Sequence, residues 1–308
     1  MTGPEQLVSD YLKALSTFEW QRLRKTEGFD YIFVDEMHLF DEQERFVIHQ
    51  LLANASIQPR VAMAIDPKQS PLELFVSHSR TDTNSDSGEM YRRAKLPNPH
   101  KLELTTVFRN TRQIQRLIQV LLDLMMHPDA NDEWETPKSK PSKNAETGDV
   151  PIYQVHKDSA EQFKSCFDAA EKMSRTGDRE QVGVICMDAE RFDTYLAAAS
   201  VRYKGKYVSI SSQEDLTDSQ EYSRRFVVTM PEYVQGLQFD HVLVLDVNDD
   251  ATNEEASGFH KQHFLTELYL ACSRARKSLE LHASMAEGGI SLLLANAMAA
   301  DTIKEAGG

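Results

Sequence analysis

The sequence has no long apolar segment and few cysteines, and both absences narrow its class. No apolar run approaches the roughly 18 to 20 residues of a membrane-spanning helix. The first ten residues, MTGPEQLVSD, lack the basic and apolar regions of a signal peptide. Cys166, Cys186 and Cys272 form no CxxC pair, which argues against a disulfide framework and a zinc site. We therefore expect a cytoplasmic protein with free thiols.

Basic residues are also in short supply. The chain carries 34 lysines and arginines against 48 acidic residues, so its formal net charge is −14. This balance argues against an indiscriminate coat on nucleic acid but leaves room for a local basic groove. With 308 residues, 41% of them hydrophobic, the chain suffices for one large or two ordinary globular domains.

A glycine-rich phosphate-binding loop is missing as well. Such a loop ends in Gly-Lys-Ser or Gly-Lys-Thr and binds nucleotide phosphates through its backbone amides and its lysine. The Gly-Lys pair of this chain is Gly205-Lys206, which Tyr207 follows, and Ser200 stands where the first glycine of the loop belongs. The sequence therefore lacks one half of a standard nucleoside triphosphate site.

The sequence does contain an alternation of short apolar strands and amphipathic helices. This alternation predicts an α/β fold in which helices cover the faces of parallel sheets. Strands are expected over 29–34, 60–65, 151–156, 182–187, 206–211, 225–230 and 241–247. Helices are expected near 159–174, 189–200, 262–276 and 290–305. Residues 128–150 are polar and rich in proline, and they predict a flexible connection.

Two adjacent carboxylates, Asp35 and Glu36, directly follow the apolar run 29–34. A nucleotide hydrolase needs one carboxylate to hold Mg²⁺ on the phosphates and another to position and deprotonate the attacking water. The same pair also suits the start of a helix, where acidic side chains are favourable. On this stretch alone both interpretations stay open.

The order of five segments favours the first interpretation. They are VDEMHLF (34–40), AIDPKQS (64–70), LTTVFRNT (104–111), VQGLQFDHVLVLD (234–246) and YLACSRARKSLEL (269–281). In order and in approximate spacing, they resemble five signature motifs of superfamily 1 DNA helicases of the UvrD/Rep kind. The resemblance covers nearly the whole chain and implies ATP hydrolysis with Mg²⁺.

Carried over residue by residue, the resemblance implies roles for eight side chains or backbone positions. The implied catalytic residues are Asp35 as Mg²⁺ ligand, Glu36 as catalytic base, Gln69 as γ-phosphate sensor, Arg109 as γ-phosphate contact and Arg274 as arginine finger. The implied nucleotide-binding positions are Phe108, which stands where the family stacks an aromatic on adenine, and Gly236 and Gln238.

The resemblance also implies an architecture. An incomplete first RecA-like domain spans 1–102 and carries the carboxylates, and a complete second one spans 103–308. Without a phosphate-loop strand, the first sheet has an unpaired edge and an uncovered apolar face. We expect an upstream segment of a longer polypeptide, another protein chain or a remodelled fold to cover it. The implied nucleic-acid partner is DNA, in single-stranded form.

Several positions depart from the family pattern. Leu72 and Leu74 replace aromatics that stack on DNA bases, and Gln235 and Gln238 replace a lysine and a glutamate. Two hypotheses follow. The chain is a helicase-type ATPase module that hydrolyses ATP slowly or not at all until a phosphate loop is supplied, or it is a catalytically inactive helicase-derived scaffold that binds a protein or nucleic acid. The five retained catalytic residues favour the first.

Overall fold

The computed structural model divides the chain into two compact units, and each is described by itself. One comprises residues 1–103 and 132–135, and the other comprises 104–131 and 136–308. The structure describes residues 22, 25–26, 28–35, 51, 61–64, 102, 104, 106–125, 140–143, 145–176, 180–212, 215, 224–248 and 258–307.

The first unit contains two short parallel strands, β1 (Ile32–Val34) and β2 (Val61–Met63). The strands alternate in burial as a pleated backbone requires, because Val34 is buried and Phe33 is 80% exposed. Asp35 follows β1 directly and is exposed.

The second unit is built on a parallel sheet. Its strands are β5 (Ile152–His156), β6 (Val182–Cys186), β7 (Tyr207–Ile210), β8 (Phe226–Thr229), β9 (Phe239–Leu245), β10 (Ala275–Ser284) and β11 (Lys304–Glu305). Among the described residues they form a seven-stranded sheet in the order β11-β5-β10-β9-β6-β8-β7, and every neighbouring pair is parallel. The predicted α/β class with a parallel sheet is confirmed, and the sheet is consistent with a RecA-like domain.

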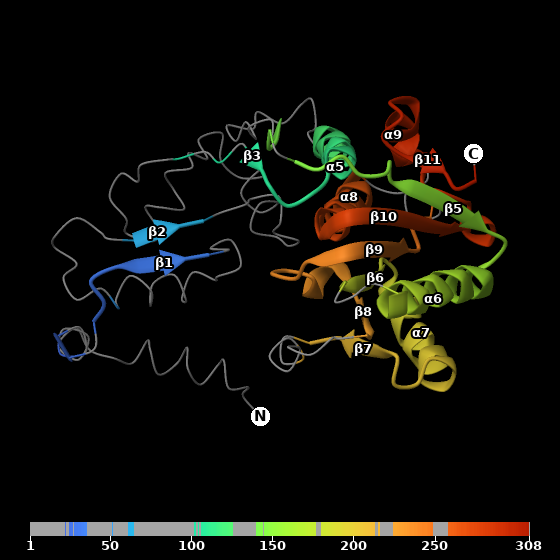
Figure 1. Ribbon diagram of the computed structural model, residues 1–308, viewed down its shortest axis with the longest axis horizontal. Helices are drawn as coiled ribbons and strands as arrows, with labels where there is room; N and C mark the ends of the chain where they lie inside the picture. Colours follow the sequence, from blue (N-terminus) through green and yellow to red (C-terminus); the bar gives the residue numbers. More distant parts are fainter. Residues whose placement is uncertain are drawn as a thin grey trace. The chain divides into compact units, whose positions relative to one another are not determined.

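Helices cover both faces of this sheet. They are α5 (Arg112–Met125), α6 (Ser159–Thr176), α7 (Ala189–Arg202), α8 (Gly258–Ser273) and α9 (Ala295–Ala299). Figure 1 shows α5 and α8 on one side of the sheet and α6 and α7 on the other. The remaining elements are short. They are two strands, β3 (Thr106–Val107) and β4 (Lys140–Pro141), and three 3-10 helices, η3 (Pro231–Tyr233), η5 (Met285–Glu287) and η6 (Leu292–Leu294).

Strand β9 shows how the two faces divide the core. Val242 and Val244 belong to the apolar cluster that includes residues of α5 and α8. Leu243 and Leu245 belong to the cluster that includes residues of α6 and α7. Residues 242–245 are therefore an uninterrupted apolar run buried on both faces, as expected in a central parallel strand.

The expected helices near 159–174 and 189–200 are confirmed, whereas the chain after α8 differs from its prediction. The helix expected near 262–276 ends at Ser273, and residues 275–276 already belong to β10, whose Leu279 and Leu281 alternate into the core. Ala275 also pairs with Phe239 of β9. The helix expected over 290–305 is replaced by η6, α9 and β11, because 304–305 pair with β5 at the sheet edge.

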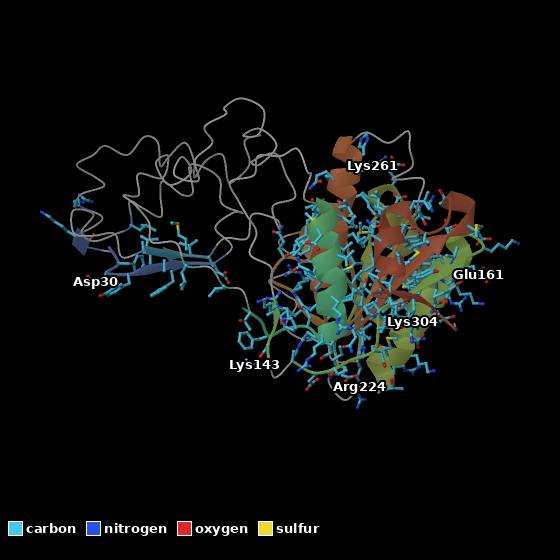
Figure 2. The ribbon with its side chains drawn as sticks, turned by 90° about the horizontal axis from the view of Figure 1, so that it is seen from above. Asp30, Lys143, Glu161, Arg224, Lys261 and Lys304 are labelled. Carbon is cyan, nitrogen blue, oxygen red and sulfur yellow. The ribbon has the colours of Figure 1, made fainter. Side chains whose placement is uncertain are left out.

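The connection expected to be flexible over 128–150 also differs in its second half. β4 pairs in parallel with β3, and Ser142 donates its backbone N–H to the Val107 carbonyl over 2.8 Å. The Arg112 guanidinium donates to the carbonyls of Lys143 and Ala145 over 3.0 and 3.1 Å. Figure 2 labels Lys143 in this loop. Residues 128–139 lie outside the described residues.

Candidate functional site

Three segments that are distant in sequence meet where α8 ends and β10 begins. Thr111 donates its backbone N–H to the Arg276 carbonyl over 3.1 Å, and Phe239 donates to the Arg274 carbonyl over 3.0 Å. These bonds join the turn 108–111, the start of β9 and the junction 273–276. We call this place the junction site. It lies at the amino ends of β9 and β10.

The turn 108–111 carries two of the sequence-predicted residues. Phe108 is 79% exposed, and Arg109 is also exposed. The turn is fixed on both sides, by β3 before it and by the first turn of α5 after it, where Arg112 donates its backbone N–H to the Glu146 carbonyl over 3.0 Å. The exposed side chains of Phe108 and Arg109 are therefore adjacent in the chain, and the backbone that carries them is fixed by hydrogen bonds on both sides.

Gly236 and Gln238 reach the same place through the segment that precedes β9. Gly236 has φ +77°, a left-handed conformation that favours glycine. Leu237 closes the turn by donating to the Val234 carbonyl over 3.0 Å, and Val234 is fully buried. Gly236 and Gln238 are both exposed, so this turn presents backbone and an amide side chain at the amino end of β9.

Arg274 lies at the centre of the junction site, but its side chain points into the protein. It is 1% exposed, and its Nε donates to the Leu270 carbonyl of α8 over 3.3 Å. An arginine is seldom buried so completely unless its charge is paired, because removing that charge from water is costly. A role at a phosphate requires this guanidinium to become accessible, and the role stays a prediction.

The predicted residues are divided between the two units. Asp35 belongs to the first unit, while Phe108, Arg109, Gly236, Gln238 and Arg274 belong to the second. Glu36 and Gln69 lie outside the described residues. Within the described part of the chain, no group of three or more histidine, cysteine, aspartate or glutamate side chains is arranged to hold a metal ion.

Charged side chains border the junction site on the sheet's amino edge. Glu180 contacts Lys277 over 2.7 Å and His241 over 2.9 Å. Hydrogen bonds from Lys277 and then His241 lower the pKa of Glu180 to about 2. Lys277 also lies 3.3 Å from Asp240, whose carboxylate accepts the backbone N–H of Gln181 over 3.0 Å. Lys277, near the start of β10, is thereby tied by ion pairs to the residue pair before β6 and to β9.

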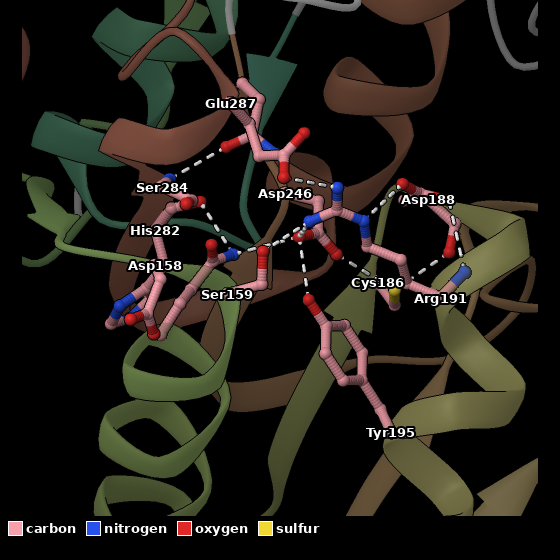
Figure 3. Close-up of polar contacts among 12 residues, drawn as sticks. Asp158, Ser159, Cys186, Asp188, Arg191, Tyr195, Asp246, His282, Ser284 and Glu287 are labelled. Atoms are coloured by element: carbon pink, nitrogen blue, oxygen red, sulfur yellow. Dashed lines mark hydrogen bonds and ion pairs between the residues drawn. The ribbon is translucent and has the colours of Figure 1, made fainter.

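A second polar cluster lies at the opposite, carboxyl edge of the same sheet, around Asp246 (Figure 3). This carboxylate is 3% exposed and accepts hydrogen bonds from Tyr195 Oη over 2.9 Å, Gln162 Nε2 over 3.2 Å and Cys186 Sγ over 3.3 Å. Burial raises the pKa of Asp246, and the hydrogen bonds from Tyr195 and Cys186 oppose the increase. Asp246 has φ 62°, an uncommon conformation for a residue other than glycine.

Arg191, from the first turn of α7, links Asp246 to the start of α7, to η5 and to the start of α6. It lies 2.9 Å from Asp188, 2.7 Å from Glu287 and 3.8 Å from Asp246, and it also donates to Ser159 Oγ. Figure 3 shows its guanidinium between the Asp188 and Glu287 side chains. The cluster therefore connects several ends of strands and helices inside the protein. Its carboxylates, Asp188, Asp246 and Glu287, are all close to the guanidinium of Arg191.

The sequence analysis did not identify Asn110, Arg191 and Asp246, which make specific polar contacts in the structure. Asp246 carried a usable signal, since it ends the apolar run of β9 just as Asp35 ends that of β1. Asn110 carried none, because its partners lie more than 160 residues away along the chain. Arg191 looks like an ordinary charge in the first turn of a helix.

Comparisons with known proteins do not assign this chain to a family. No protein-family model matches it, and no curated protein matches it. One of the solved structures that match is described as the C-terminal domain of a possible DNA helicase from Lactobacillus plantarum WCFS1. The two share 20% sequence identity with a TM-score of 0.45, over 64% of this chain and 98% of that one.

The helices that the structure describes also bear on membrane insertion. None of those described is both long and apolar enough to cross a membrane.

Proposed function

We propose that this chain is a helicase-related ATPase module of the superfamily 1, UvrD-like kind, which needs a phosphate-binding loop from elsewhere to hydrolyse ATP. The observation that carries the proposal is the junction site. Three of the five helicase-like segments, far apart in sequence, are joined there by backbone hydrogen bonds. The segments that follow the helicase-like order in the sequence are therefore also neighbours in space.

The chemistry of phosphoryl transfer gives each residue a task in this proposal. Negative charge develops on the equatorial oxygens of the γ-phosphate, and arginine guanidinium groups stabilise it. Arg109 is exposed and would contact the γ-phosphate, while Arg274 would act as arginine finger after its side chain leaves Leu270. Phe108 would stack on adenine, and Gly236 and Gln238 would line the nucleotide.

The other half of the reaction falls to the first unit. Asp35, exposed at the end of β1, would hold Mg²⁺, and Glu36 would orient and deprotonate the attacking water. Mg²⁺ supplies charge neutralisation on the phosphates when bound. Gln69 would sense the γ-phosphate. In this proposal a second chain or segment contributes the phosphate loop, and single-stranded DNA is the nucleic-acid partner.

One observation favours the second hypothesis, a helicase-derived scaffold without catalysis. The Arg274 guanidinium is enclosed and hydrogen-bonded to its own helix, which suits a structural role better than a catalytic one. In a scaffold, the exposed Phe108 and Arg109 would instead contact a protein or nucleic-acid partner.

The test begins with a pull-down of the tagged chain from its native cells, followed by mass spectrometry of what co-purifies. We expect a polypeptide that carries GxxxxGK[ST]. ATP hydrolysis is then measured for the recovered assembly with the wild-type chain, with Glu36→Gln and with Arg109→Ala. Both variants should lower kcat by at least about a hundredfold, because each removes a group that acts on the transferring phosphoryl. Arg116→Ala, an exposed arginine on α5, is the matched control and should retain the wild-type rate.

Two results would contradict the catalytic role of this chain. One is recovery of partners that all lack a phosphate loop, which would favour the scaffold. The other is an assembly whose hydrolysis is unchanged by Glu36→Gln. A tenfold rise in hydrolysis when single-stranded DNA is added to the isolated 308-residue chain would show instead that no completing segment is needed.

A further inference from the structure

Asn110 stands between the two predicted phosphate-contacting arginines. It follows Arg109 in the turn before α5, and it is 6% exposed. Its side-chain amide offers two N–H donors. One donates to the Ser273 carbonyl over 3.4 Å, and the same nitrogen makes a short hydrogen bond to the Ala275 carbonyl. These acceptors are the residues on either side of Arg274.

The carbonyls of the junction 273–276 show what this amide does. All four accept hydrogen bonds, three of them from the turn 108–111 and one from the first residue of β9. The pairs are Ser273 with Asn110 Nδ2, Arg274 with Phe239 N, Ala275 with Asn110 Nδ2, and Arg276 with Thr111 N. The Arg274 carbonyl accepts from β9 while the carbonyls of Ser273, Ala275 and Arg276 accept from the turn 108–111, so the junction is bonded to both segments at once. The Asn110 amide is the side-chain element of this connection.

We propose that Asn110 is a positioning residue: its amide holds the backbone at Arg109 and the backbone at Arg274 in a fixed position relative to each other. The inference rests on the proposed function for the roles of the two arginines, and it names the group that sets their spacing. A displacement of the turn 108–111 must then carry the junction 273–276 with it. A positional error in one arginine becomes an error in both.

Substitutions at Asn110 can separate hydrogen bonding from size. Asn110→Asp keeps the volume but places acceptor oxygens against two carbonyls, which removes both bonds and adds repulsion. Asn110→Ser keeps one donor and should give an intermediate effect. Asn296→Asp makes the same chemical change at an exposed position of α9 and is the matched control.

The experiment is hydrogen exchange, measured by NMR on the full chain without nucleotide. In Asn110→Asp we expect the amides of Thr111 and Phe239 to exchange at least about tenfold faster, in line with the loss of one or two buried hydrogen bonds. The Arg109 backbone amide should become mobile on the picosecond to nanosecond timescale in relaxation measurements. Amides of Val184 and Val228, in β6 and β8, should keep wild-type rates, and Asn110→Ser should restore part of the protection.

Two outcomes would overturn the inference. Unchanged exchange at Thr111 and Phe239 would mean that the amide holds nothing in place. An equal loss of protection at Thr111, Phe239, Val184 and Val228 would mean that Asn110 only contributes to overall stability. Since no nucleotide is present, either result leaves the ATPase test standing, and failure of that test leaves the exchange result interpretable.

Discussion

Asp246 illustrates how one buried carboxylate can hold several elements together. Three donors and one guanidinium converge on it, from α6, β6 and α7. Such a group is costly to bury and is maintained by its hydrogen bonds, so removing it leaves buried donors without partners.

We predict that Asp246→Ala lowers the free energy of unfolding by about 3 kcal/mol, because Tyr195 Oη and Gln162 Nε2 then lose an acceptor and Arg191 loses a nearby charge. Tyr195→Phe should cost about 1 kcal/mol, the size of one hydrogen bond. Urea unfolding measures both. The control is Asp193→Ala on the exposed face of α7, and an Asp246→Ala variant as stable as that control would contradict the prediction.

Glu180 predicts a particular pH dependence of stability. Its folded pKa of about 2 lies below the roughly 4.3 of an unfolded glutamate, mainly through hydrogen bonds from Lys277 and His241. A lowered carboxyl pKa stabilises the fold above the unfolded pKa, and this contribution disappears as pH falls towards the folded value. We expect the stability gap between wild type and Glu180→Gln to be full near pH 6 and to shrink from about pH 5 downwards.

Urea unfolding between pH 6 and pH 3 checks this expectation. Lys277→Met is the companion variant, because it removes the first of the two partners and should reduce the same pH-dependent gap. A gap between wild type and Glu180→Gln that stays constant over this range would show that the ion pairs do not set the glutamate's titration.

The site was only partly predictable from single residues. The pattern of apolar strand followed by carboxylate points to Asp35, and the segment order points to Arg109 and Arg274. The same pattern at Asp246 shows that it marks a strand end without specifying its chemistry. The contacts of Asn110 could not be predicted from the sequence, because the two carbonyls that accept from its amide belong to residues more than 160 positions away in the chain.

At the scale of elements, most strands and helices of the second unit follow from apolar periodicity. Strand β10 is the informative exception. Its basic start, ARKS, suits a solvated helix end, and its apolar residues follow without a turn signal. This segment forms a strand because the neighbouring strands β5 and β9 pair with it on both sides. Tertiary pairing therefore overrides the local preference.

Gly183 of β6 provides a test of how closely β6 and β9 pack. A Cβ added there would lie 2.6 Å from the ring of Phe239, which is 1% exposed. We predict that Gly183→Ala costs about 1 to 3 kcal/mol of unfolding free energy through overpacking. Because Phe239 also donates to Arg274, the variant should perturb NMR shifts at the junction site.

Gly258→Ala is the matched comparison for that substitution. It lies at the first residue of α8, and nothing stands within 4 Å of an added Cβ. This change should be neutral or stabilising by up to about 1 kcal/mol, because alanine restricts the unfolded chain. Equal effects of the two substitutions would contradict the close packing at Gly183.

At the scale of the molecule, the two units differ in what they contain. Both apolar core clusters found among the described residues lie within the second unit. The sequence placed a boundary between 102 and 103 from motif order, and contacts divide the chain after 103, apart from residues 132–135. The division into two RecA-like domains was implied by the resemblance of the five segments and stays a prediction, whereas the assignment of 132–135 to the first unit depends on tertiary contacts.

We predict that a fragment of residues 104–308 folds alone. It holds the complete seven-stranded sheet of the described structure and both clusters, so a cooperative unit of ordinary domain size remains. Thermal unfolding followed by circular dichroism should show one cooperative transition, within about 5 °C of the corresponding transition in the full chain. A fragment with native-like helix content but no cooperative transition would show that its core requires the first unit.

The order of the strands has a consequence for how the protein is made. β5 lies between β10 and β11, yet both partners come from the last part of the chain, while β6 to β9 are translated in between. A ribosome therefore releases β5 with neither neighbour available, and the sheet is completed only when the C-terminal residues emerge. During that interval the nascent chain exposes strand edges that chaperones bind and other nascent chains can pair with, and truncation before β10 would leave β5 without either of its partners in the sheet.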